Sequence, residues 1–128
     1  NNHMGSKFTG NWQAMKVLMF ELQERKLFWL DSMTHSSSVG TKVAAEVGVN
    51  SVARDIFIDN ELSRVSILNQ LALLEKKALE RGYAIGIGHP NLITYQTLSE
   101  WVMSIKKRAI KLVRISDIIE NKTNTKRY

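Results

Sequence analysis

His89 and Pro90 end a short apolar run at a point where a histidine could take part in chemistry. Residues 83–87 (YAIGI) are too few and too interrupted by glycine for a helix, so they predict a strand buried on both faces. Pro90 favours a break there, because proline cannot extend a sheet ladder. His89 would then follow the carboxyl end of a strand, the edge where α/β sheets and barrels collect binding and catalytic groups.

Further histidines and carboxylates are expected at the same edge. Asp31 and His35 follow one predicted strand, and Asp59 ends another. His3 precedes the first predicted helix, in a loop that an upstream strand would deliver to the same side. Imidazole and carboxylate are the ligands of a catalytic zinc or related divalent ion that keeps one position open for water. These residues therefore predict a metal site at this edge.

Structural roles are the alternative for each of these side chains. No pair has the spacing of a metal motif such as His-Glu-x-x-His, so His3 is alternatively an exposed loop histidine and Asp31 a loop cap. Arg54 and Asp55 are adjacent on a predicted strand and point to opposite sides, where structural ion pairs are the default. The Gly-x-Gly at 86–88 lacks the third glycine of a dinucleotide loop, which excludes that motif.

The composition is typical of one soluble globular domain. Of the 128 residues, 44% are hydrophobic and 23% are charged. No apolar run approaches the length of a membrane span, and the first residues lack the basic start and apolar stretch of a secretory signal. The absence of cysteine excludes disulfides, thiolate catalysis and cysteine-based zinc sites.

The formal net charge of +6 raises the alternative of a nucleic-acid-binding module. Much of this charge lies at 106–114 and in the tail after 121. A solvated helix face and a frayed terminus explain that distribution more simply, so no nucleic-acid partner is expected. Steeply salt-dependent binding to DNA or RNA would indicate the alternative.

Helices and strands alternate along the predicted chain. Apolar spacing and capping residues predict helices at 11–25, about 38–46, 61–81 and 94–108, and strands at 27–30, 54–59, 83–87 and 110–115. The longest helix is expected to carry one broad apolar face, formed by Leu62, Val65, Leu68, Leu71, Ala72, Leu74, Ala78 and Leu79. A single turn is expected at 116–120, followed by a disordered basic tail; the domain boundary is placed at 119, with the tail at 120–128.

This alternation predicts an α/β fold built from βα units with a parallel sheet. Four strands are few for a self-sufficient sheet, and a barrel needs about twice that number. We therefore expect residues 1–119 to be the C-terminal portion of a larger domain. An apolar sheet edge left exposed would promote self-association of the 128-residue chain.

Four blocks in order resemble the divergent polysaccharide deacetylase family. They are residues 2–9 (NHMGSKFT), 31–34 (DSMT), 54–60 (RDIFIDN) and 87–90 (IGHP), and the resemblance runs from residue 1 to about 118. It implies a distorted (β/α) barrel like that of chitooligosaccharide deacetylases. Such domains begin with a strand ending in an Asp-Asp pair and carry a further histidine before the first block. Neither is found in this sequence, so the site is expected to be incomplete in this chain.

The resemblance implies metal-dependent hydrolysis of acetyl groups from a polysaccharide or oligosaccharide. His89 matches the late histidine that acts as acid or transition-state stabiliser, Asp31 would orient it, and His3 would bind a divalent metal, zinc being the expected ion. Substrate contacts are expected from Asn2, Lys7, Thr34 and Asp59. Lys7 stands where arginine is frequent in similar sequences, which leaves contacts to an anionic substrate open.

The same resemblance leaves a second function open. A non-catalytic envelope or carbohydrate-binding protein could keep the barrel without hydrolysis. In either case a periplasmic or secreted location is expected. As an isolated chain the protein is expected to be inactive, because the carboxylate base would lie in an upstream segment.

Overall fold

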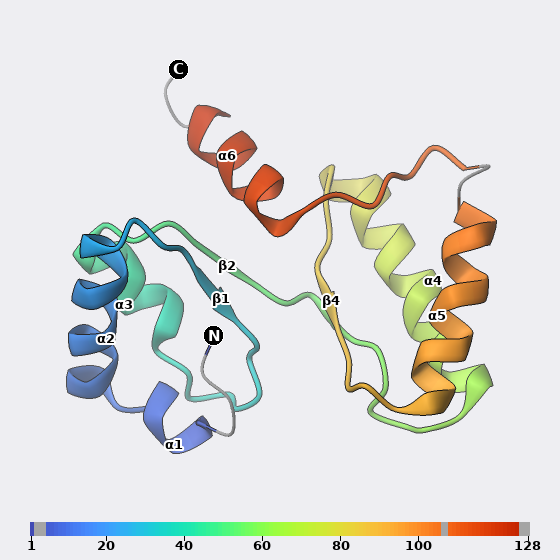
Figure 1. The fold of residues 1–128 in the computed structure, drawn as a ribbon, viewed down its shortest axis with the longest axis horizontal. Coiled ribbons are helices and arrows are strands. Elements are labelled where there is room, and N and C mark those ends of the chain that lie inside the picture. The colour runs from blue at the N-terminus through green and yellow to red at the C-terminus, as the bar shows by residue number, and fades with distance from the viewer. Residues whose placement is uncertain (2–4, 106–107, 126–128) are drawn as a thin grey trace. The chain divides into compact units, whose positions relative to one another are not determined.

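The computed structural model describes residues 1, 5–105 and 108–125 and divides the chain into two compact units (Figure 1). Unit 1 comprises the described residues of 1–53 and 115–125, and unit 2 comprises those of 54–114. Unit 1 contains α1 (Ser6–Thr9), α2 (Trp12–Glu24), β1 (Trp29–Asp31), α3 (Gly40–Val47), β2 (Ser51–Ala53) and α6 (Ile115–Thr125). Unit 2 contains β3 (Ile56–Phe57), α4 (Arg64–Arg81), β4 (Gly86–Ile87) and α5 (Leu92–Ile105).

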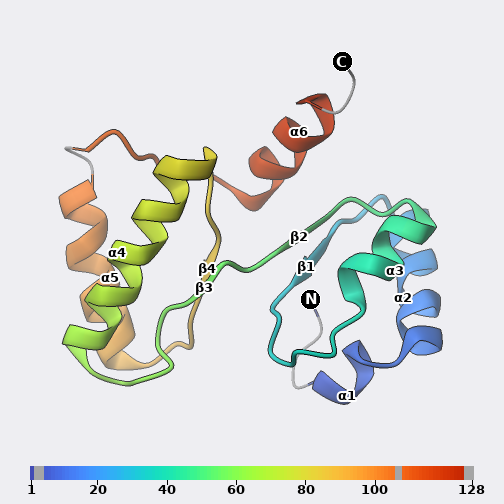
Figure 2. The same ribbon diagram turned by 180° about the vertical axis from the view of Figure 1, so that it is seen from behind.

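Unit 1 is built around two helices and a pair of parallel strands. β1 pairs with β2, with Leu30 opposite Val52, and both views show α2 and α3 side by side (Figures 1 and 2). Asn11 caps α2 by accepting a hydrogen bond from the Ala14 N–H. α3 ends at Gly48, whose left-handed φ of 89° favours glycine. The core contains Met15, Met19, Trp29, Val43, Ala44 and Val49.

Unit 2 places two helices against its own pair of parallel strands. Phe57 of β3 lies opposite Ile87 of β4. Ser63 caps α4 and Gly82, with a φ of 84°, ends it. A Cβ on Gly86 would lie 2.9 Å from a Leu74 methyl carbon, so glycine allows β4 to approach α4 closely. The core contains Ile56, Ile58, Ile67, Leu71, Trp101 and Ile105.

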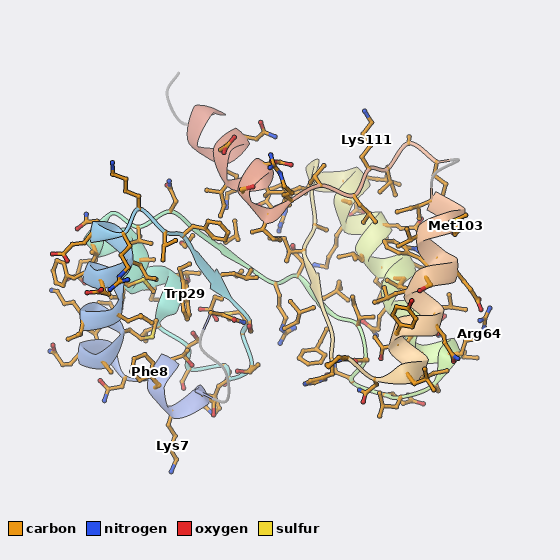
Figure 3. All side chains as sticks on the ribbon, in the orientation of Figure 1. Lys7, Phe8, Trp29, Arg64, Met103 and Lys111 are labelled. Atoms are coloured by element: carbon orange, nitrogen blue, oxygen red, sulfur yellow. The ribbon has the colours of Figure 1, made fainter. Side chains whose placement is uncertain are left out.

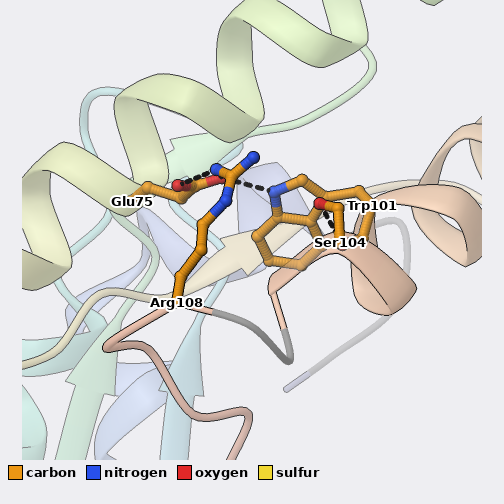
Figure 4. A network of polar contacts seen from close by, with 4 residues as sticks. All are labelled: Glu75, Trp101, Ser104 and Arg108. Carbon is orange, nitrogen blue, oxygen red and sulfur yellow. Dashed lines mark hydrogen bonds and ion pairs between the residues drawn. The ribbon is translucent and has the colours of Figure 1, made fainter.

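A polar network joins α4 to α5 and to the segment that follows it (Figure 4). The Glu75 carboxylate accepts a hydrogen bond from Trp101 Nε1 at 2.7 Å and forms an ion pair with Arg108 Nη1 at 2.5 Å. Ser104 donates to the Trp101 carbonyl within α5. Glu75 thereby satisfies the indole N–H at the edge of the core, as a largely buried tryptophan requires.

The expected α/β class with parallel strands is confirmed, but several elements differ from the sequence prediction. The described residues form two separate two-stranded sheets. The predicted strand at 54–59 is replaced by β2 and β3, because the N–H groups of Asp55 and Ile56 both donate to the Ile85 carbonyl and interrupt the ladder. α3 begins at Gly40 with no side-chain cap, and α5 begins at Leu92, two residues before the predicted start at residue 94.

The last predicted strand and the predicted tail are also different. Residues 110–114 pair with no described strand. Leu112 and Val113 are exposed there, so burial of these side chains does not stabilise a strand. α6 continues through Thr125, beyond the single predicted turn, and buries Ile118 and Ile119. The C-terminal half of this segment is polar, so burial of these two apolar side chains is what stabilises the helix. Residues 126–128 of the predicted tail lie outside the described residues.

The apolar face of α4 is narrower than predicted. Ile67 and Leu71 are fully buried, whereas Val65 and Leu79 are largely exposed. α4 packs against α5 and β3 along one side, so only the side chains on that side are buried. No described helix has the length and apolar character needed to cross a membrane.

Candidate functional site

The carboxyl ends of β3 and β4 bring Asp59 and His89 together in unit 2. Phe57 lies opposite Ile87, and Asp59 and His89 each follow two residues later. Side chains two residues apart in an extended segment lie on the same face. The strand register therefore explains why residues 30 positions apart in the sequence meet.

Asp59 is the buried centre of this group, with 4% of its surface exposed. Its Oδ2 accepts hydrogen bonds from the His89 backbone N–H at 2.7 Å and from the Thr94 hydroxyl at 2.9 Å. Burial alone would raise the pKa of Asp59, but these hydrogen bonds and the neighbouring His89 charge outweigh it and hold the pKa below its ordinary value of 3.8. Asp59 is thus an ionised carboxylate at neutral pH.

His89 presents its imidazole to solvent while one ring nitrogen faces Asp59. Its side chain is 63% exposed, and Nδ1 lies 3.3 Å from Asp59 Oδ1. The ring centroid is 5.3 Å from that of Phe57. The Asp59 carboxylate favours a proton on Nδ1 of His89. Nε2 is then the ring nitrogen that can contact a ligand. The arrangement can hold an imidazole in one orientation for proton transfer or for hydrogen bonding to an oxygen.

Asp31 has a different set of contacts, all within unit 1. It is 1% exposed, its Oδ1 accepts from the Met33 N–H at 2.9 Å, and its Oδ2 accepts from the Ser38 hydroxyl at 2.8 Å. These are the contacts of a loop cap, the structural alternative raised by the sequence. Within unit 2, Asp59 is the carboxylate that contacts His89, and the orienting role predicted for Asp31 stays a prediction.

Gly40 and Trp29 lie beside Asp31. A Cβ on Gly40 would lie 2.6 Å from both Asp31 Oδ2 and Trp29 Nε1, so only glycine fits at the start of α3. Trp29 Nε1 is buried and has no hydrogen-bond partner among the residues that the structure describes. The indole and carboxylate therefore face the same small space beside Gly40 (Trp29 is labelled in Figure 3).

The other predicted site residues that the structure describes lie in unit 1. Lys7 is exposed and extends away from α1 (Figure 3), and Thr34 is exposed in the loop after β1. His35 accepts a hydrogen bond on Nδ1 from the Ser37 N–H at 3.2 Å. Asn2 and His3 lie outside the described residues. Within 5–105 and 108–125 no three histidine, aspartate or glutamate side chains come together as a metal site would require.

A family model described as divergent polysaccharide deacetylase matches residues 1–119 of this chain. The chain belongs to the divergent polysaccharide deacetylase family. This confirms the family resemblance carried by the four sequence blocks. Family membership by itself leaves catalysis and metal dependence open.

Two curated relatives of this family member share its sequence, and one solved structure shares its fold. It is 39% identical over 121 residues to an uncharacterized protein of Haemophilus influenzae, covering 94% of this chain and 43% of that protein. It is 33% identical over 119 residues to the uncharacterized protein YibQ of Escherichia coli, covering 93% of this chain and 37% of YibQ. The crystal structure of an uncharacterized protein from Agrobacterium tumefaciens C58 matches with a TM-score of 0.88 at 26% identity, over 91% of this chain and 48% of that one. The chain thus spans less than half the length of these relatives.

Phe57 and Thr94 contact the Asp59 and His89 pair, and the sequence prediction did not assign either of them to a site. The signal for Phe57 is its position two residues before Asp59, on the same side of a strand. No sequence pattern points to Thr94, because its contact depends on how α5 meets the end of β3.

Proposed function

We propose that this chain carries the histidine side of a site that removes acetyl groups from a sugar. The observation that carries the proposal is the Asp59 and His89 pair at the ends of β3 and β4, in a member of the divergent polysaccharide deacetylase family. The substrate is a polysaccharide or oligosaccharide, and a periplasmic or secreted location belongs to the same proposal. Because the relatives are more than twice as long, the activity is proposed for the protein at its full length.

In this proposal His89 acts in the last step of the reaction, when the bond between the acetyl carbon and the sugar breaks. Hydrolysis adds water to the acetyl carbonyl carbon and breaks the bond from that carbon to the sugar nitrogen or oxygen, giving acetate and a free amine or hydroxyl. The leaving atom needs a proton, and protonated His89 can donate one from Nε2. Asp59 supports the imidazolium and its orientation, and Thr94 holds Asp59 in turn.

The metal expected from the family cannot be assigned to the described side chains. They form no cluster of three ligands, and Asp59 already accepts hydrogen bonds on both carboxylate oxygens. His3, the predicted ligand, lies outside the described residues. A divalent metal such as zinc therefore stays a prediction.

The replacement His89→Gln tests the proposal. Acetate release from chitotetraose is measured with the full-length protein, and the rate is expected to fall about 100-fold or more because the general acid is lost. Lys76→Gln, which removes an exposed charge in the middle of α4, serves as the control and keeps the rate. Far-UV circular dichroism checks that both variants are folded.

Two results would contradict the proposal. Equal rates for the wild type and His89→Gln would remove His89 from catalysis. Chitotetraose binding without acetate release by the wild type would instead support the second function, a carbohydrate-binding protein that keeps the fold and has no hydrolytic role.

A further inference from the structure

Arg54 and Asp55, which directly precede β3, contact different side chains. Both carboxylate oxygens of Asp55 are engaged by Arg81, at 2.9 Å and 3.0 Å, and one also accepts from the Ile85 N–H. This is the structural ion pair that the sequence predicts by default. The Arg54 guanidinium carbon instead lies 5.1 Å from the centre of the Phe57 ring, a distance at which a cation and an aromatic face attract each other.

Phe57 connects Arg54 to the candidate site. The same Phe57 ring has the His89 imidazole as its other aromatic neighbour, at 5.3 Å between centroids. Ile56 and Ile58 point into the core with α4 and α5, and Phe57 occupies the alternate position between them. A guanidinium and an imidazole are therefore placed around one phenyl ring, two residues before Asp59.

The chemistry of these groups favours an acidic ligand. Arginine remains charged at any physiological pH and binds a carboxylate through two parallel N–H bonds. Its guanidinium has five N–H donors, so two can engage a ligand while the others keep contacts within the protein. Asp59 keeps its negative charge, but its buried carboxylate is engaged by three donors from His89 and Thr94, which partly offset its repulsion of a ligand carboxylate.

We infer that Arg54 is a specificity-determining residue that recognises a carboxylate on the carbohydrate bound at His89. The ligand class is an acidic oligosaccharide, one that carries carboxylates beside its acetylated amino sugars. The inference rests on the proposed function for the location of the sugar. It adds the requirement for negative charge, which family membership does not supply.

The test compares two oligosaccharides that share N-acetylglucosamine and differ in charge. A hyaluronan tetrasaccharide, with alternating glucuronate, and neutral chitotetraose are each titrated into the full-length protein. Binding is followed by the backbone amide shifts of residues 54–60 and 86–91. The acidic tetrasaccharide is expected to bind about tenfold more tightly at low salt, the scale of one charge-assisted hydrogen bond. Added salt should reduce this preference.

Substitutions separate Arg54 from the general positive charge of the chain. Arg54→Gln should make the two affinities equal, and Arg54→Lys should retain only part of the preference, because lysine lacks the planar fork. Lys76→Gln removes one charge elsewhere in unit 2 and should keep the preference.

Equal binding of both oligosaccharides by the wild type, or binding of neither, overturns the inference. So does a preference that survives Arg54→Gln. The proposed function fails separately, through acetate release that does not depend on His89, so the two failures are distinguishable.

Discussion

At the residue scale, one carboxylate organises the candidate site. Asp59 receives the backbone N–H and the ring of His89 together with the Thr94 hydroxyl. Three donors around a buried acid make its ionised form more stable in the folded protein than in water. A residue predicted only as a substrate contact thus holds the exposed imidazole in place.

The lowered pKa of Asp59 makes its contribution to stability depend on pH. An unfolded chain titrates this carboxyl near 3.8 and the folded chain below that value, so its stabilisation is fully present above about pH 4 and is lost as pH falls through the folded pKa. Thr94→Val removes one donor and should lower the free energy of unfolding by about 1 kcal/mol at pH 7. The loss should become smaller once the pH falls through the folded pKa, because Asp59 is then protonated. Urea unfolding at pH 7 and at successively lower pH values, through pH 3, measures it.

Thr97→Val is the matched control for this prediction. Thr97 is also buried in α5, but its hydroxyl donates to the Ile93 carbonyl and contacts no acid. Its substitution should cost the same free energy at pH 7 and pH 3. A Thr94→Val effect that is equally independent of pH would show that the hydroxyl does not stabilise the charge on Asp59.

At the element scale, the start of α3 depends on a close approach that only glycine permits. Ser38 bridges the Asp31 carboxylate and the Gly40 N–H, and Gly40 lies directly against Asp31 and Trp29. Side chains from both ends of the β1 to α3 loop thereby hold the helix.

Gly40→Ala should therefore destabilise the protein strongly. Its Cβ would meet two buried polar atoms at 2.6 Å, and forcing them apart is expected to lower the free energy of unfolding by about 1 to 3 kcal/mol. Gly10→Ala is the control, because Gly10 has an ordinary φ of −83° and the nearest atom to its Cβ would be the Ser37 hydroxyl oxygen, at 3.2 Å. Denaturant unfolding of both variants decides; equal stabilities would mean that the contact at Gly40 relaxes at no cost.

At the scale of the whole molecule, each unit has a parallel strand pair and its own core. A two-stranded sheet leaves unpaired N–H and C=O groups along its edges, and such edges pair readily with another chain. Large apolar side chains are also exposed in both units, among them Phe20 on α2 and Val65 on α4. These features keep self-association as a prediction for the 128-residue chain.

Sedimentation over a range of concentrations measures this association. The expected result is a species heavier than the 14.6 kDa monomer, with a mass that rises with concentration. A monomeric mass at every concentration, together with a sharp two-state melt, would show that the exposed edges are protected in solution.

The sequence alone determined the local structure and the family of this protein. Asn11, Gly48 and Gly82 mark helix ends through interactions within a few residues of themselves. The alternation of helices and strands predicts parallel pairing, and the four blocks identify the divergent polysaccharide deacetylase family. All of these signals are local or are repeated along the chain, which is why sequence patterns carry them.

Only the tertiary structure decided which side chains share a site. The carboxylate beside His89 is Asp59 because Phe57 pairs with Ile87, and this register joins segments 30 residues apart. Thr94 and Arg54 enter the same neighbourhood through the packing of α5 and the interrupted ladder before β3. Register, packing and ladder breaks depend on contacts between distant residues, and no spacing in the sequence encodes them directly.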